Sequence, residues 1–188
     1  GTTAWHLVDD SRRDPMGTVT YRELMVQVWY PGSGQQQRTQ ASCAGDTVTG
    51  HSVEHIALAA DRPLPVVFLA PGRGMAACMY SAVAETMASA GYVVVGVDSP
   101  HSGRVHYPSG RVVPPSPEFK PPRTLFQGSY ENVDAFFEPA SQAGGQDILF
   151  VLKHLESINN DDPDGLFTGR LGLDRMGLFA HSLGGRIA

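Results

Sequence analysis

The most informative stretch of the sequence is Arg175-Met176-Gly177-Leu178-Phe179-Ala180-His181-Ser182-Leu183-Gly184-Gly185. Its first six residues form a short apolar run that is typical of a buried strand. The residues that follow match the G-x-S-x-G pattern with one change, and in that pattern a strand turns sharply into a helix and exposes a serine hydroxyl. Ala180 and Gly184 are small enough for the two arms of such a turn to pass each other. The pattern therefore predicts Ser182 as a nucleophile.

Composition and charge restrict the classes of protein that this chain can represent. The chain has 188 residues, 41% of them hydrophobic and 18% charged, which is enough for one globular domain with a sizeable core. A net charge of −5 provides no basic surface for nucleic acid. No apolar run approaches the roughly 20 residues that a transmembrane segment needs, and no signal peptide is recognisable at Gly1. The cellular compartment and the oligomeric state stay open.

Two cysteines, Cys43 and Cys78, have no metal-ligand spacing. They are either buried thiols or one disulfide, and the sequence does not choose between the two.

Strand and helix patterns alternate along the rest of the chain. Strands are predicted over 18–30, 65–70, 92–98 and 175–180, and helices over 80–90 and 146–158. The polar stretch 35–60 predicts a loop with one weak strand. The apolar face of the first helix is expected to carry Tyr80, Val83, Ala84, Met87 and Ala88. This order predicts an α/β fold, in which helices cover both faces of a mostly parallel sheet.

The stretch between residues 99 and 145 lacks periodicity, and prolines at six positions between 108 and 122 argue against regular structure in it. Aromatic residues recur there, at Tyr107, Phe119, Phe126, Tyr130, Phe136 and Phe137. Such a stretch either walls a substrate cleft or wraps the surface with its aromatic side chains packed on the core. Both alternatives stay open.

Three features follow predicted strands and are expected at the carboxyl edge of the sheet, where open α/β sheets bind ligands. They are the turn 71–74, the segment 98–101 and Ser182. A serine that attacks an ester or amide carbonyl needs a base to take its proton and fixed donors for the oxyanion.

The backbone N–H groups of Arg73 and Leu183 are the donors that we predict for this oxyanion. Gly72 permits a tight turn before Arg73, and Gly184 permits the sharp turn at the nucleophile. The alternative interpretations are an ordinary loop at Arg73 and a chance match in a helix cap at Ser182.

With these residues the chain resembles the α/β-hydrolases, and most closely the platelet-activating-factor acetylhydrolase-like and dienelactone-hydrolase-like serine esterases. The segments that carry the resemblance are 21–31, 65–74, 90–98, 146–152 and 169–185. It implies a serine esterase that cleaves short or oxidised acyl esters, from small-molecule or lipid substrates, through an acyl-enzyme on Ser182. It implies no metal and no organic cofactor.

Other functions share the same pattern. Polyester hydrolases, lipases and peptidases of this fold differ from esterases in pocket and lid. Pro71-Gly72 stands where the acetylhydrolase-like group has His-Gly, and a Pro-Gly turn also occurs in polyester hydrolases. A noncatalytic binding module with this fold is the alternative from another class.

The resemblance also implies a catalytic acid and histidine after the nucleophile, because α/β-hydrolases have the chain order Ser, acid, His. We therefore expect residues 1–188 to be the N-terminal part of one hydrolase domain, inactive alone, with the strand 175–180 at an exposed sheet edge. His101, just after a predicted strand, is the substitute base to consider, although a loop histidine is the alternative. His181 is expected to pack beneath the nucleophile.

Overall fold

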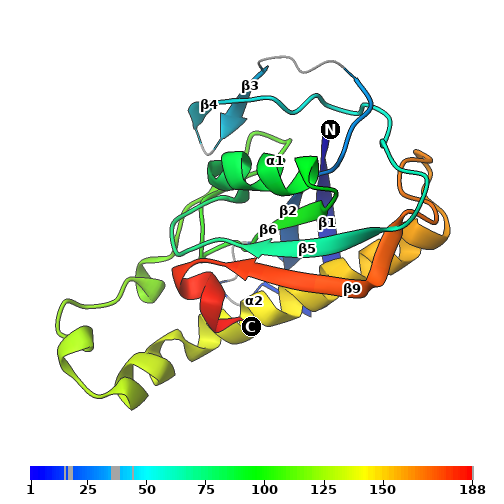
Figure 1. Cartoon of the computed structure of the whole chain (residues 1–188). Helices are drawn as coiled ribbons and strands as arrows, with labels where there is room; N and C mark the ends of the chain where they lie inside the picture. The colour runs from blue at the N-terminus through cyan, green and yellow to red at the C-terminus, as the bar shows by residue number, and fades with distance from the viewer. Residues whose placement is uncertain (15, 17–18, 35–38, 44, 188) are drawn as a thin grey trace.

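A five-stranded sheet forms the centre of the molecule (Figure 1). The computed structural model describes all residues except 15, 17–18, 35–38, 44 and 188. The strand order is β1-β2-β6-β5-β9; β1 and β2 pair antiparallel, as do β2 and β6, whereas β5 pairs parallel with both β6 and β9. The strands are β1 (Thr2–Arg13), β2 (Tyr21–Trp29), β5 (Leu64–Ala70), β6 (Val93–Asp98) and β9 (Leu171–Ala180).

Helices cover both faces of this sheet, as the sequence predicts (Figure 1). The 3₁₀-helix η1 (Ala77–Tyr80) and helix α1 (Ser81–Ser89) lie on one face, and helix α2 (Tyr130–Asn160) lies on the other. Strand β6 shows how the two cores form, because successive side chains of a strand point to opposite faces. Val93 and Val95 join the cluster under α2, whereas Val94 joins the cluster under α1.

Helix α2 is much longer than the predicted helix over 146–158, so the prediction of irregular structure is wrong for residues 130–145. The Ser129 hydroxyl caps the helix by accepting a hydrogen bond from the Asn132 N–H. Pro139 lies inside the helix on the solvent side, where water can replace the hydrogen bond that proline cannot donate. Buried residues recur every three or four positions from Phe137 to Ile158, and this stripe packs the whole helix on the molecule.

Other boundaries also differ from the predictions. Strand β1 is absent from the predicted strands, and the predicted loop contains a hairpin of two strands, β3 (Thr39–Cys43) and β4 (Asp46–Gly50). Strand β9 begins at Leu171 instead of 175, because its pairing with β5 shifts register between Pro65 and Val66. Ala84 and Ala88 are buried on α1 as expected, but Val83 is exposed. Thr18, the predicted start of a strand, lies outside the described residues, as do 35–38 and 44 of the predicted loop.

Strand β9 is the edge of the five-stranded sheet in the part of the chain that the structure describes, as predicted. Its side chains Met176 and Leu178 are 45% and 38% exposed. Unpaired edge strands of this kind are prone to pair with other chains. None of the helices in the described ranges is long and apolar enough to span a membrane.

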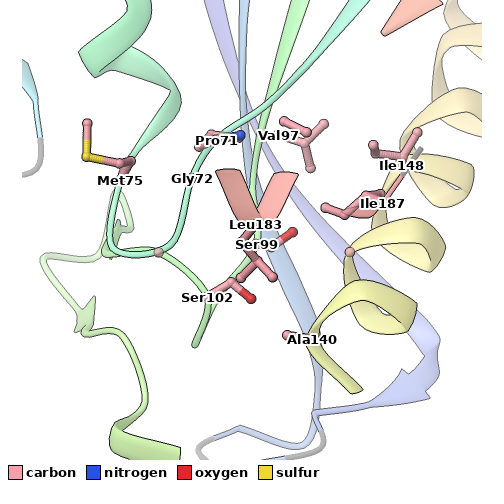
Figure 2. Close-up of a pocket in the computed structure, with 13 residues that line it drawn as sticks. Pro71, Gly72, Met75, Val97, Ser99, Ser102, Ala140, Ile148, Leu183 and Ile187 are labelled. Atoms are coloured by element: carbon pink, nitrogen blue, oxygen red, sulfur yellow. The ribbon is translucent and has the colours of Figure 1, made fainter. Parts of the chain in front are cut away.

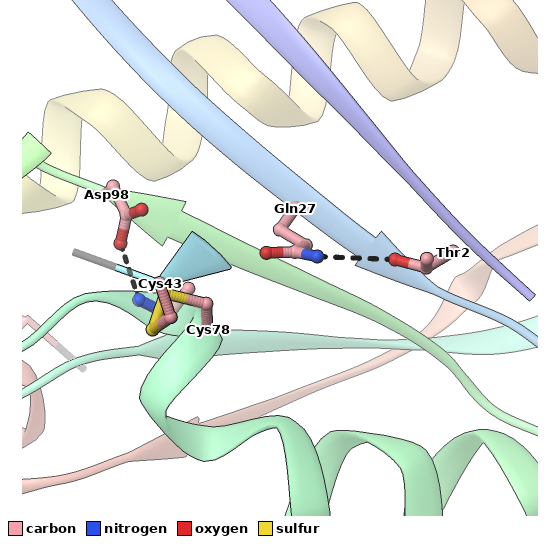
Figure 3. The surroundings of a disulfide bond; sticks show 6 residues. Thr2, Gln27, Cys43, Cys78 and Asp98 are labelled. Carbon is pink, nitrogen blue, oxygen red and sulfur yellow. Dashed lines mark hydrogen bonds between the residues drawn. A yellow bond between two sulfur atoms is a disulfide. The ribbon is translucent and has the colours of Figure 1, made fainter. Parts of the chain in front are cut away.

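The disulfide that the sequence left open is formed between Cys43 on β3 and Cys78 on η1, and both are drawn in Figure 3. It ties the β3-β4 hairpin to η1. The Asp98 carboxylate, at the end of β6, accepts a hydrogen bond from the Ala77 N–H at 2.6 Å and anchors η1 a second time. Gln27 and Thr2, also in Figure 3, join β2 to β1 through a 3.4 Å side-chain hydrogen bond.

Ion pairs fasten α2 to the other face of the sheet. Arg22 on β2 is buried and donates two hydrogen bonds to the carboxylate of Asp147 on α2, at 2.7 and 3.1 Å. Arg12 donates a third hydrogen bond to the same carboxylate at 3.0 Å. Each charge in this cluster is therefore compensated, as burial requires.

Candidate active site

Ser182 lies in a strained turn at the carboxyl end of β9. The backbone angle φ of Ser182 is +52°, in the left-handed region that residues other than glycine rarely occupy. Such a conformation costs on the order of 1–3 kcal/mol and is concentrated at functional sites. The side chain is exposed, and its hydroxyl forms no hydrogen bond with any residue that the structure describes.

The sequence around Ser182 folds in this way because Gly184 lies directly against the end of β5. A Cβ atom at Gly184 would collide with the carbonyl oxygen of Ala70. The same oxygen accepts a hydrogen bond from the His181 N–H at 3.2 Å, so the turn closes over the last residue of β5. The expected helix after the serine is a short 3₁₀-helix, η4 (Ser182–Arg186), in this structure.

The turn after β5 brings a second group of backbone N–H donors to the same edge. Most of its donors are used inside the protein: Gly72 N–H binds the Tyr80 hydroxyl at 3.1 Å, and Gly74 N–H binds the Ser102 carbonyl at 2.7 Å. The N–H of Arg73 donates to no acceptor among the described residues. The Arg73 side chain turns back toward the loop and donates to the Ser116 carbonyl at 3.4 Å.

The N–H of Leu183, like that of Arg73, donates to no acceptor among the described residues. It lies in the first turn of η4, where helical N–H groups have no partner within the helix, and it has no other acceptor in the described ranges. The two donors that the sequence predicts are therefore both available to a ligand oxygen. Their role stays a prediction.

A small cavity of about 20 Å³ lies between this turn, η4 and α2. Figure 2 shows Pro71 and Gly72 on one side, Ala140 and Ile148 of α2 on the other, and Leu183 between them. Ser99 and Ser102 reach it from the loop after β6. Small and apolar side chains line most of the cavity.

The aromatic residues of the stretch 99–145 do not line this cavity. Tyr107 is buried beside Val105 and Val113, and Phe137 is buried against Leu183. Phe126 and Tyr130 are exposed. The structure therefore favours the second alternative, in which this stretch wraps the surface and its buried aromatics pack on the core.

His101 is held away from the proposed chemistry by a buried contact with Asp14. Its Nε2 lies 2.8 Å from the Asp14 carboxylate, and only 3% of the residue is exposed. Arg22 is 3.7 Å from the same carboxylate, which connects His101 to the ion cluster below α2. His101 also has a left-handed backbone, with φ of +71°. As a substitute base for Ser182 it has no support from these contacts.

The Asp98 carboxylate faces η1, where it accepts the hydrogen bond from the Ala77 N–H. Burial raises the pKa of its carboxyl to about 7, although the hydrogen bond from the Ala77 N–H opposes this shift. Asp98 therefore supports η1. No group of three or more potential metal ligands occurs among the described residues.

His181 does not pack beneath Ser182, and that prediction is wrong. The residue is exposed, and its Nδ1 lies 2.7 Å from the Tyr80 hydroxyl. The reason is that Gly72 occupies the space below: a Cβ atom at Gly72 would lie 2.7 Å from His181 Nδ1. Tyr80 is thus a site residue that the sequence placed only on the apolar face of a helix.

Comparison with known structures shows the fold. A ferulic acid esterase from Streptomyces cinnamoneus is similar over 98% of this chain, with 31% sequence identity and a TM-score of 0.68. A dipeptidyl aminopeptidase IV from Bacteroides ovatus matches with 14% identity and a TM-score of 0.46, over all of this chain and 18% of its own length. No family model and no curated protein matches the sequence.

The chain has the α/β-hydrolase fold, as the sequence resemblance predicted. Its own order of elements agrees: two antiparallel strands, then parallel strands with α1 and α2 on opposite faces, then the turn at Ser182. The chain spans about half the length of the ferulic acid esterase, 52% of that chain.

Proposed function

We propose that this chain belongs to a carboxylic ester hydrolase that acts through an acyl-enzyme on Ser182. The observation that carries the proposal is the Ser182 turn, in which a strained residue presents an exposed hydroxyl next to the available N–H of Leu183. The available N–H of Arg73 lies in the neighbouring turn, where Gly72 packs against His181. The 31% identity with a ferulic acid esterase supports an ester as the substrate.

The geometry suits acyl transfer. In the first step the Ser182 Oγ attacks the ester carbonyl, and its proton passes to a general base. The N–H groups of Arg73 and Leu183 stabilise the oxyanion of the tetrahedral intermediate. Collapse of this intermediate expels the alcohol, which takes the proton from the base. Water then attacks the acyl-enzyme in the same way, and the carboxylic acid leaves.

The general base and the catalytic acid come, in this proposal, from outside residues 1–188. Two observations support this: His101 is occupied by Asp14, and the similar esterase is about twice as long. Hydrolases of this fold also place their acid and histidine after the serine. Residues 1–188 would then be part of one hydrolase domain and inactive alone.

For the acyl group we propose a short chain, as in substrates of the platelet-activating-factor acetylhydrolase-like group. This preference rests on the resemblance of segments 65–74 and 169–185 to that group. Feruloyl esters are the second candidate, favoured by the identity with the ferulic acid esterase. The disulfide between Cys43 and Cys78 is compatible with a protein from an oxidising compartment.

Hydrolysis assays on the natural protein test this function. Substrates are p-nitrophenyl acetate, butyrate and octanoate, methyl ferulate and platelet-activating factor. We expect the highest kcat/KM with acetate, and a loss of at least about 10³-fold in Ser182→Ala. Ser89→Ala, an exposed serine at the end of α1, is the matched control and should keep full activity. A folded protein that hydrolyses none of these esters contradicts the proposal and favours the binding module.

A further inference from the structure

The hydroxyl of Tyr80 joins the two turns of the site. Tyr80 is the last residue of η1, and its hydroxyl accepts a hydrogen bond from the Gly72 N–H at 3.1 Å. On its other side it lies 2.7 Å from His181 Nδ1, and the two rings are tilted with centroids 5.9 Å apart. One oxygen atom therefore contacts both the turn after β5 and the turn after β9.

Each partner of this hydroxyl directly precedes a residue with a proposed role. Gly72 precedes Arg73, whose N–H is a proposed oxyanion donor, and His181 precedes Ser182. Because a peptide group is planar, the position of Gly72 sets the direction of the Arg73 N–H. The two turns also touch, since a Cβ atom at Gly72 would lie 2.7 Å from His181 Nδ1. A shift of either turn would thus move donor and nucleophile relative to each other.

The position of Tyr80 is itself well fixed. The disulfide at Cys78 and the Asp98 carboxylate at the Ala77 N–H hold η1 from two directions. The Tyr80 ring also packs against the cluster of Trp29, Leu69 and Val94 under α1. The hydroxyl therefore comes from a rigid support and can impose a position on the turns that it binds.

We infer that Tyr80 is a positioning residue of the hydrolase site. Its hydroxyl keeps the Arg73 N–H aligned with the Ser182 Oγ, and it acts through Gly72 and His181 without touching the substrate. This inference rests on the proposed function. Alignment of an oxyanion donor stabilises the transition state more than the bound substrate, so loss of the hydroxyl lowers kcat and leaves KM nearly unchanged.

The test is Tyr80→Phe in the natural protein, which removes one oxygen and keeps the ring. We expect kcat to fall by about 10- to 100-fold, with KM within about twofold, because loss of a whole donor costs about 10²–10³. The affinity for a trifluoromethyl ketone, which forms an oxyanion on the serine, should fall by the same factor as kcat/KM. Tyr92→Phe is the matched control, since the Tyr92 hydroxyl has no partner in the described ranges.

A double-mutant cycle separates positioning from general stabilisation. If the hydroxyl acts through His181, the Tyr80→Phe effect on kcat should be smaller in a His181→Ala background. Unchanged kcat and ketone affinity in Tyr80→Phe, or equal effects in both backgrounds, would overturn the inference. The proposed function stands in that case, provided that Ser182→Ala is inactive; a natural protein without esterase activity refutes both.

Discussion

Two turns leave the carboxyl edge of the sheet through a left-handed residue that is not glycine, His101 after β6 and Ser182 after β9. The two turns differ in the contacts that the side chain of the left-handed residue makes. The strain at His101 accompanies a buried hydrogen bond with the Asp14 carboxylate, which connects to the cluster of Arg22 and Asp147. The strain at Ser182 accompanies an exposed hydroxyl without a partner among the described residues.

The comparison teaches that a strained backbone is not by itself evidence of function, because at His101 it accompanies a buried structural contact. His55 adds a third case, with φ of +54° and an exposed side chain, in a turn where its N–H binds the Thr2 carbonyl at 3.0 Å. At Ser182 the strained residue also lies next to Leu183, whose N–H has no acceptor among the described residues and whose side chain lines the cavity. Four substitutions test this contrast.

The largest effect is expected for Gly184→Ala. The new methyl group would collide with the Ala70 carbonyl oxygen, so the turn must move away from β5. We expect a loss of about 3 kcal/mol in the free energy of unfolding and a large fall in esterase activity. Gly185→Ala is the control, because no atom lies within 4 Å of a Cβ at that position. Urea unfolding measures both; equal losses in the two variants would show that the turn is not tightly packed on β5.

His101→Ala should be the next most harmful. It removes the partner of a buried carboxylate, but Asp14 keeps Arg22 at 3.7 Å, so we expect a loss of about 2–3 kcal/mol instead of the usual 3–5 for a broken buried pair. His55→Ala, with similar backbone strain and an exposed side chain, should change stability by less than about 0.5 kcal/mol. Thermal unfolding of both variants measures these changes in stability. An unchanged stability in His101→Ala would contradict a structural role for the contact between His101 and Asp14.

Asp98→Asn tests how the carboxyl group at the end of β6 makes the free energy of unfolding depend on pH. The folded pKa of Asp98 is raised to about 7, above its ordinary value of 3.8, so the folded state holds the proton more tightly than the unfolded state. Its stabilising contribution is therefore complete below about pH 4 and is lost as the pH rises to about 7. The variant should equal the natural protein near pH 4 and exceed it by about 2 kcal/mol at pH 8.

Urea unfolding at pH 4.5 and pH 8 measures this difference. The expected 2 kcal/mol is about half of what the full shift corresponds to, because solvent reaches part of the Asp98 residue. Other titrating groups are shared by the two proteins and cancel in the comparison. A stability difference that is the same at both pH values would contradict the assignment.

Ser182→Gly should have the smallest effect on stability, and this effect should be a gain. Glycine adopts positive φ without strain, and the Ser182 side chain has no partner to lose among the described residues, so we expect a gain of about 1 kcal/mol together with loss of activity. The same exchange at His101 should destabilise the protein. Thermal unfolding under identical conditions compares the two, and a destabilised Ser182→Gly would mean that the hydroxyl has a structural role.

The fold could be predicted where the sequence carries local signals. The apolar runs over 65–70 and 92–98 are strands buried on both faces, and they correspond to β5 and β6. Strand β1 gave no such signal because half of its residues are exposed and its apolar side chains are few. The start of α2 was missed because the prolines at 121, 122 and 139 conceal a buried stripe that begins at Phe137.

In the candidate site, too, the residues that local sequence signals predict differ from those that only the tertiary structure brings together. Ser182, Arg73 and Leu183 lie in turns whose geometry follows from neighbouring residues, so the sequence could point to them. The hydrogen bond between Tyr80 and His181 joins residues 101 positions apart, and the one between His101 and Asp14 joins residues 87 positions apart. No local sequence pattern predicts contacts between such distant residues. The choice between free thiols and a disulfide likewise depended on the packing of β3 against η1.

The central claim is that Ser182 is an activated nucleophile, and covalent labelling tests it most directly. The natural protein and residues 1–188 alone are incubated with a fluorophosphonate, and the modified peptide is identified by mass spectrometry. We predict modification of Ser182 in the natural protein, no other modified serine, and no reaction of residues 1–188 alone, which lack the proposed base. A folded natural protein that stays unmodified, or carries the label on a different serine, would contradict the account.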